Sequence, residues 1–272
     1  MQKAIAADYR RRGYPTEKMR RKHSITQSAF MGRDVYTLHP PKGDSTETRV
    51  VLYFHGGAYF YDIMKEHFAG LSKLCIASDT TIIAPRYPLA PDASVQDIRD
   101  FGVAIFNDIR VQYPKAKIIM GGDSAGAGLA VQVAQYQRDN DEESAAALIL
   151  WSPWVDVSMS NPDVIAADAR SVMIGLDGIA MATALYIGDR DPKDPLCSPI
   201  YGDLSGLPPL HIWAGGRDLL YPDILKFADL AKAAGTEVHL TQVKGQNHMW
   251  MFLPQPEAKA VMRQTATAIA AA

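Results

Sequence analysis

Apolar residues gather along this chain in short continuous runs, and longer segments with mixed apolar and charged positions separate these runs. Short apolar runs bounded by Gly or Pro are typical of strands that are buried on both faces of a parallel sheet. The predicted strands are 50–54, 81–84, 117–120, 147–150, 210–214 and 237–243, and the predicted helices between them are 65–77, 95–112, 125–138 and 222–234. This alternation predicts a doubly wound α/β fold with right-handed crossovers.

The beginning of the chain has a different pattern. The opening stretch to about His23 is expected to form one or two short helices. Residues 24–31 and 33–39 then flank Gly32, which is the signal of a β-hairpin. With this hairpin the expected sheet has eight strands and is mostly parallel, with helices on its faces. The length of the chain fits a single domain over residues 1–272.

One interval, residues 152–209, interrupts the alternation. It is rich in Pro, Asp and Gly and contains one helical candidate, 177–187. Long insertions in compact domains commonly serve as lids over a site. The alternative is a surface loop without function. The interval follows the carboxyl end of a predicted strand, where the chemical motifs described next also lie. We therefore expect it to act as a lid.

A nucleophile motif follows the predicted strand 117–120. The segment 122–126 reads Gly-Asp-Ser-Ala-Gly, which matches the pattern G-x-S-x-G with Ser124 at its centre, and it leads directly into a predicted helix. A sharp turn from strand to helix projects the serine hydroxyl from the sheet, and small neighbours relieve the crowding. The helix N-terminus also presents free N–H groups to a developing oxyanion. The glycine spacing does not fit the dinucleotide pattern G-x-G-x-x-G.

A glycine-rich segment, 55–59, directly follows the strand 50–54 and reads His-Gly-Gly-Ala-Tyr. Glycines let a backbone approach a ligand closely and turn its N–H groups toward a carbonyl oxygen. The amides of Gly57 and Ala58, together with that of Ala125, are the predicted oxyanion hole. A tight turn around a buried histidine is the alternative. The position of the segment, one strand before the nucleophile region, favours the oxyanion hole.

A serine hydroxyl needs a neighbouring imidazole to take its proton. Of the seven histidines, only His248 falls in a loop after the last predicted strand, where the chain order Ser…Asp/Glu…His places the base. Asp218 is the first carboxylate after the preceding strand and is predicted to orient the imidazole, with Asp223 as the second choice. Asp123, beside Ser124, is expected to brace the elbow or the oxyanion loop.

In combination these motifs resemble the hormone-sensitive-lipase-like branch of the α/β-hydrolases, which includes bacterial acetyl esterases. The matching segments span most of the chain and are 55–59, 86–92, 122–126, 152–156, 216–218 and 247–248. The resemblance implies an α/β-hydrolase fold in which Ser124 is the nucleophile, His248 the general base and Asp218 its partner. It also implies a cap built from the N-terminal segment and an insertion after the sixth strand, which fits about 1–23 and 155–200 here.

Two departures from the family pattern are visible. Ala58 replaces the third glycine of His-Gly-Gly-Gly, which keeps the amide but narrows the loop. The N-terminal region is also short, so the cap is expected to be small and the substrates to be short-chain, soluble esters. Aromatic and thioether groups close to the motifs are the candidates for the substrate pocket, with core packing as the alternative: Tyr59, Trp154, Met249 and Trp250.

Composition narrows the range of partners. A formal net charge of −2 gives no reason to expect nucleic acid or an anionic membrane. The sequence shows neither a signal-peptide core nor an apolar stretch of about eighteen residues, so we expect a cytoplasmic protein with no membrane partner. Cys75 and Cys197 are far apart and are expected to be reduced, buried side chains. The last strand is a sheet edge, which leaves a homo-oligomer open beside a monomer.

The expected function is therefore that of a serine carboxylesterase that needs no cofactor or metal. An amidase, a formamidase or a peptidase would use the same machinery and is the first alternative. A non-catalytic binding protein of the same fold would be expected to lose part of the triad, whereas all three candidates are present here. A metal-dependent hydrolase is disfavoured because the histidines show no H-x-x-x-H spacing and no carboxylate cluster.

Overall fold

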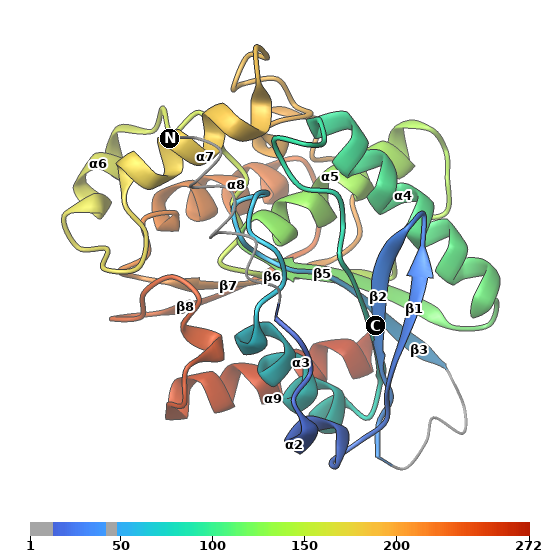
Figure 1. Cartoon of the computed structure of the whole chain (residues 1–272). Helices are drawn as coiled ribbons and strands as arrows, with labels where there is room; N and C mark the ends of the chain where they lie inside the picture. The colour runs from blue at the N-terminus through green and yellow to red at the C-terminus, as the bar shows by residue number, and fades with distance from the viewer. Residues whose placement is uncertain (1–12, 42–47) are drawn as a thin grey trace.

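The computed structural model describes residues 13–41 and 48–272. Its centre is an eight-stranded sheet with the order β1-β2-β4-β3-β5-β6-β7-β8 (Figure 1). The first two pairings, β1 with β2 and β2 with β4, are antiparallel, and all others are parallel. The strands are β1 (Ile25–Phe30), β2 (Arg33–Leu38), β3 (Arg49–Phe54), β4 (Thr81–Pro85), β5 (Lys117–Asp123), β6 (Ala147–Trp151), β7 (Leu210–Gly215) and β8 (Val238–Val243). The predicted eight-stranded, mostly parallel sheet is confirmed.

The opening hairpin forms where the sequence predicts it. Phe30 pairs with Arg33, which leaves Met31 and Gly32 as a two-residue turn. Both turn residues have positive φ, 48° and 73°. This conformation is that of the hairpin turns whose twist matches the twist of the flanking strands.

Helices cover both faces of the sheet (Figure 1). On one face lie α4 (Val95–Gln112), α5 (Ala125–Asp139) and α8 (Tyr221–Ala233), and on the other lie α3 (Lys65–Ser78) and α9 (Pro256–Ala271). Two clusters of buried apolar side chains, one on each face, correspond to these two layers. Among the described residues no helix has the length and apolar character needed to cross a membrane. Both cysteines are free and buried, as expected.

Helix α9 is the main element that the apolar pattern did not reveal. It begins with Pro256 at its first position, which suits a helix start. Its buried positions include Val261, Thr265 and Ala268, at helical spacing. Small residues dominate this tail, so its apolar stripe is weak in sequence. Packing against α3 and the sheet gives it a buried face that local pattern alone does not show.

The insertion between β6 and β7 contains α6 (Pro162–Asp168), α7 (Leu176–Ile187) and the 3₁₀ turn η1 (Pro199–Tyr201). Figure 1 shows α6 and α7 on the same side of the sheet as α5 and α8. The short helix α2 (Glu17–Arg20) lies on the other side, near α3. His23, which follows α2, bonds to Ser72 of α3 at 2.8 Å. Residues 17–23 therefore lie apart from the insertion, and residues 1–12 of the predicted cap fall outside the described part of the chain.

Candidate active site

Ser124 lies at a sharp turn, between the last residue of β5 and the first residue of α5. Its backbone has φ 51° and ψ −120°, a combination that a residue with a side chain rarely adopts. A Cβ added to Gly122 would lie 2.4 Å from the carbonyl oxygen of Phe54, so the turn requires glycine at that position. This is the geometry that G-x-S-x-G predicts, with the serine side chain presented at the carboxyl end of the sheet.

The structure brings the three predicted triad residues together. The Nε2 atom of His248 is 3.0 Å from Oγ of Ser124, and its Nδ1 atom is 2.9 Å from Oδ2 of Asp218. An ionised carboxylate can only accept, so Nδ1–H donates to Asp218 and leaves Nε2 to accept the serine proton. All three residues are buried. The arrangement therefore suits proton removal from the hydroxyl of Ser124.

Backbone hydrogen bonds hold the loops that carry the acid and the base. The Leu220 amide donates to Oδ1 of Asp218 at 3.0 Å, which leaves Oδ2 directed at the imidazole. The Arg217 amide donates to the carbonyl of Gln246 at 2.8 Å and so ties the loop after β7 to the loop after β8. Asp218 and His248, 30 positions apart in the chain, are thus set against each other by neighbouring parallel strands.

The environment of His248 raises the pKa of its imidazole above the ordinary value of 6.5. Burial alone would lower this pKa, but the charge of Asp218, its hydrogen bond and the more distant charge of Asp123 raise it. A base with a raised pKa is protonated up to a higher pH.

Asp223, the second choice for the acid, is occupied elsewhere. It lies in the first turn of α8 and accepts a hydrogen bond from Asn161 of the insertion at 2.9 Å. Burial, chiefly, raises the pKa of its carboxyl group to about 6, and the nearby charge of Asp156 adds to this effect. Asp223 therefore connects the insertion to α8, and Asp218 is the carboxylate that reaches the histidine.

The predicted oxyanion loop follows β3 in an unusual backbone conformation. Gly57, Ala58 and Tyr59 all have positive φ, at 125°, 52° and 64°. At Gly57 a Cβ would lie 2.7 Å from the carbonyl oxygen of Tyr61, so only glycine fits there. Within the described residues, no hydrogen bond uses the amide of Gly57 or Ala58. Together with the amide of Ala125 at the start of α5, they are the predicted donors to an oxyanion.

Asp123 accepts a hydrogen bond from the start of this loop and holds it in place. Its Oδ1 accepts hydrogen bonds from the Tyr53 hydroxyl at 2.6 Å and from the Gly56 amide at 3.0 Å. Its Oδ2 is 3.3 Å from Nε2 of His67, whose Nδ1 accepts the Met64 amide. The sequence predicted the brace, but it did not reveal Tyr53 and His67 as its members. No linear spacing marks them, because they lie on a different strand and helix.

The surroundings of Asp123 favour its charged form. Burial would raise the pKa of Asp123, but His67 and the hydrogen bonds from His67, Tyr53 and Gly56 lower it below its ordinary value. The carboxylate is therefore ionised. His55, the first residue of the loop, stacks on Tyr87 with ring centroids 4.3 Å apart. Burial, chiefly, lowers the pKa of His55 to about 4, which keeps this ring neutral.

The four predicted pocket residues differ in burial and in the face of the sheet on which they lie. Tyr59 and Trp154 are fully buried on the α5 face of the sheet, with ring centroids 5.9 Å apart. Trp250 is fully buried on the other face, in the cluster that contains α3 and α9. Met249 is half-buried beside His248, with φ 59°. The structure thus brings Tyr59 and Trp154 together and places Trp250 in a different core.

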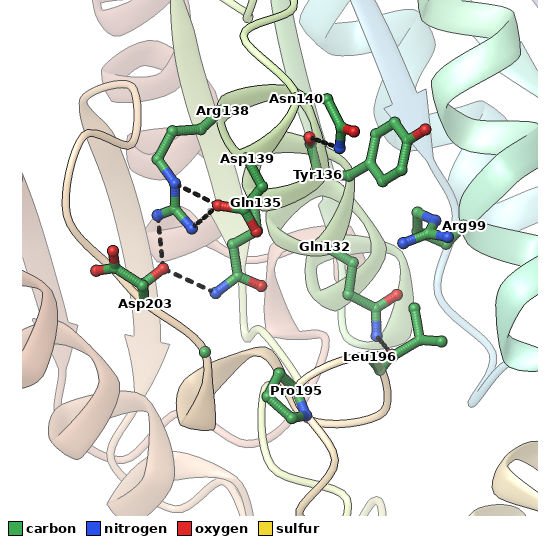
Figure 2. Close-up of a pocket in the computed structure, with 11 residues that line it drawn as sticks. Arg99, Gln132, Gln135, Tyr136, Arg138, Asp139, Asn140, Pro195, Leu196 and Asp203 are labelled. Atoms are coloured by element: carbon green, nitrogen blue, oxygen red, sulfur yellow. Dashed lines mark hydrogen bonds and ion pairs between the residues drawn. The ribbon is translucent and has the colours of Figure 1, made fainter.

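A polar pocket of about 210 Å³ lies on the outer side of α5, where the insertion passes it (Figure 2). Its lining includes Arg99 of α4, Gln132 and Tyr136 of α5, and Leu196 of the insertion. None of the three triad residues lines it. In the described part of the chain, no group of three or more His, Cys, Asp or Glu side chains is placed to hold a metal ion.

Comparisons with known proteins agree with this geometry. The family model of the α/β-hydrolase fold matches residues 51–252. An acetyl-hydrolase from Streptomyces hygroscopicus is 32% identical over 203 residues, which cover 74% of this chain and 68% of that protein. An esterase from Acinetobacter venetianus is 29% identical over 229 residues, or 83% of this chain and 76% of the relative.

Solved structures give the same result. A hormone-sensitive lipase from a metagenome library superposes with a TM-score of 0.88 at 27% identity and covers all of this chain and 92% of its own. The esterase EstE5, soaked with p-nitrophenyl butyrate, superposes with a TM-score of 0.89 at 25% identity, over 98% of this chain and 90% of that one. The chain belongs to the α/β-hydrolase family, in its hormone-sensitive-lipase-like branch.

Proposed function

We propose that this protein is a serine carboxylesterase that hydrolyses short-chain acyl esters through Ser124, His248 and Asp218. The observation that carries the proposal is the hydrogen-bonded chain from Ser124 Oγ to His248 Nε2 and from His248 Nδ1 to Asp218, at 3.0 and 2.9 Å. The hydrogen-bonded chain is buried and lies at the carboxyl ends of parallel strands, beside a loop whose Gly57 and Ala58 amides have no hydrogen-bond acceptor among the described residues. These are the parts that acyl transfer needs.

In the acylation step, His248 accepts the proton of Ser124 as Oγ forms a bond to the ester carbonyl carbon. The carbonyl oxygen becomes an oxyanion, which the amides of Gly57, Ala58 and Ala125 stabilise. Collapse of this tetrahedral intermediate breaks the bond to the alcohol oxygen, which leaves with the proton from His248. Asp218 keeps the imidazole oriented and stabilises the imidazolium that forms.

Deacylation repeats these steps with water. His248 takes a proton from a water molecule, whose oxygen attacks the acyl carbonyl of the serine ester. The second tetrahedral intermediate occupies the same oxyanion hole. Its collapse returns the proton to Oγ of Ser124 and releases the carboxylic acid. The products are one alcohol and one acid for each ester and water consumed.

Two observations support a preference for short acyl chains. The insertion, which we propose as the cap, contains two α-helices of 7 and 12 residues and one 3₁₀ turn among its described residues. A relative at 32% identity is named an acetyl-hydrolase. Both observations favour a small acyl pocket within one domain.

The proposal is tested with p-nitrophenyl esters of increasing acyl length, on the wild type and on Ser124→Ala. Ser28→Ala, which changes an exposed serine of β1, is the matched control. We expect activity that is highest on the shortest chains, that disappears in Ser124→Ala and that is unchanged in Ser28→Ala. Equal activity in Ser124→Ala would contradict the mechanism. Turnover of p-nitroanilides but not of esters would instead support an amidase.

A further inference from the structure

The side chain of Tyr59 is enclosed by three different parts of the molecule. Its ring stacks face to face on Tyr186 of α7, with centroids 3.8 Å apart and planes 6° from parallel. Trp154, which follows β6, lies against it at 5.9 Å. A Cβ added to Gly128 of α5 would lie 2.8 Å from the Tyr59 hydroxyl oxygen, so the helix surface also fits closely around the ring. The phenol ring is completely buried.

This burial counteracts strain in the oxyanion loop. Ala58 and Tyr59 are consecutive residues with side chains in the left-handed region, at φ 52° and 64°. That conformation is unfavourable for such residues and persists only where the surroundings enforce it. The Tyr59 carbonyl accepts the Ala90 amide at 2.8 Å, which fixes the backbone of Tyr59. The stack on Tyr186 fixes the side chain of the same residue.

Tyr186 comes from the insertion and is itself held firmly. It shares the buried face of α7 with Ile179 and Ala182, at helical spacing. Its hydroxyl accepts a hydrogen bond from Nε2 of Gln132 at 3.0 Å. The same nitrogen donates to the carbonyl of Leu196 at 2.8 Å (Figure 2). Gln132 of α5 therefore links Tyr186 to a later segment of the insertion.

We propose that Tyr186 is a positioning residue for the ester hydrolysis. Its ring holds Tyr59, and through Tyr59 it holds the Ala58 amide in the conformation that binds the oxyanion. The insertion therefore has a second task besides covering the site, because the oxyanion hole is complete only when α7 is docked. This inference rests on the proposed function for the role of the Ala58 amide.

The position of the contact predicts which kinetic constant changes. The stack touches the loop residue after Ala58 and not the serine or the histidine. A displaced Ala58 amide weakens the hydrogen bond to the oxyanion, which exists only after Ser124 has attacked. Interactions made only in the transition state affect kcat and leave KM nearly unchanged.

The experiment compares three variants by hydrolysis of p-nitrophenyl acetate. Tyr186→Ala removes the stacked ring, and we expect kcat to fall about 10- to 100-fold with KM within about 3-fold, as for a catalytic group displaced by about 1 Å. Tyr186→Phe keeps the stacked ring and loses the hydroxyl with its bond to Gln132, so kcat should stay within about 3-fold of wild type. Ile179→Ala truncates another buried side chain of α7 and is the matched control, with kcat unchanged.

Amide hydrogen exchange of residues 55–61 gives a second readout that does not depend on activity. We expect faster exchange of this segment in Tyr186→Ala and wild-type exchange in Tyr186→Phe. Tyr186→Leu replaces Tyr186→Ala if the latter does not fold. An equal loss of kcat in Ile179→Ala, or unchanged exchange of 55–61 in Tyr186→Ala, would overturn the positioning role. A wild type inert on every ester would overturn the proposed function, and the exchange data would still decide the inference.

Discussion

Two buried histidine–aspartate pairs lie at the same end of this sheet, and only one of them faces the nucleophile. His248 contacts Asp218 at 2.9 Å, and His67 contacts Asp123 at 3.3 Å. All four side chains are buried. By residue type, burial and contact distance the two pairs are close to equivalent.

The pairs differ in what the second ring nitrogen meets. In His248 this nitrogen is Nε2, and it faces the hydroxyl of Ser124 at 3.0 Å. In His67 it is Nδ1, which accepts the Met64 amide at 3.0 Å and is therefore already occupied. The first pair can therefore exchange a proton, and the second can only hold its carboxylate in place.

The two carboxylates also have different tasks. Asp218 gives its Oδ2 to the imidazole and is otherwise held by one backbone amide. Asp123 accepts from Tyr53, Gly56 and His67, so it organises the oxyanion loop and reaches His248 only through its charge. A contact between histidine and aspartate is thus insufficient evidence for catalysis. The partner of the second ring nitrogen distinguishes the two pairs.

The largest effect is expected from His248→Ala. It removes the proposed general base, so kcat/KM for p-nitrophenyl acetate should fall by about 10⁴-fold or more. Circular dichroism should show an unchanged fold, because the imidazole lies at the end of a loop. Activity within tenfold of wild type would show that the catalytic pair is misassigned.

Asp218→Asn should come next, with kcat reduced about 10³- to 10⁴-fold, because an amide no longer holds the correct tautomer of His248. The matched change in the second pair, Asp123→Asn, should lower kcat only about 10- to 100-fold. It disturbs the oxyanion loop but leaves the contacts of His248 with Ser124 and Asp218 intact. The two variants are compared by steady-state kinetics on one ester. Equal losses would remove the distinction between the pairs.

The pH dependence of kcat/KM tests whether the charge of Asp123 affects the pKa of His248. The pKa of His248 is raised, so kcat/KM should decline with falling pH at a value above 6.5, where the base becomes protonated. Asp123→Asn removes one negative charge that favours the imidazolium. The acid limb of its profile should therefore move to lower pH. A limb that stays in place would show that Asp123 acts on His248 by geometry alone.

The smallest effect is expected from His67→Gln. Its amide can still donate to Asp123 but fits the Met64 amide poorly, so kcat should change only a few-fold. The free energy of unfolding, measured with urea, should fall by about 1–2 kcal/mol for the loss of the partly buried hydrogen bond with the Met64 amide. His239→Gln is the control, because it alters an exposed pair with Glu237 and should be nearly neutral. Equal destabilisation in both variants would argue against the brace.

Local patterns were sufficient for much of the site. The turn that carries Ser124 could be predicted because strand, small residues and helix follow one another in sequence. Asp218 and His248 could be predicted because each follows its own strand, and parallel strands bring such loops to one edge of the sheet. The same reasoning could not place Trp250, because a residue beyond a strand end can fold back onto either face.

The sequence by itself determined the order of the eight strands along the chain and the sharp turn at Ser124, and it predicted the three triad residues, since each depends on near neighbours. Only the tertiary structure decided that Tyr186 stacks on Tyr59, 127 positions away along the chain. The same holds for the contact between His67 and Asp123, which are 56 positions apart. Such contacts depend on how whole elements pack. Periodicity reports which face of a helix is buried, but it does not report which partner that face meets.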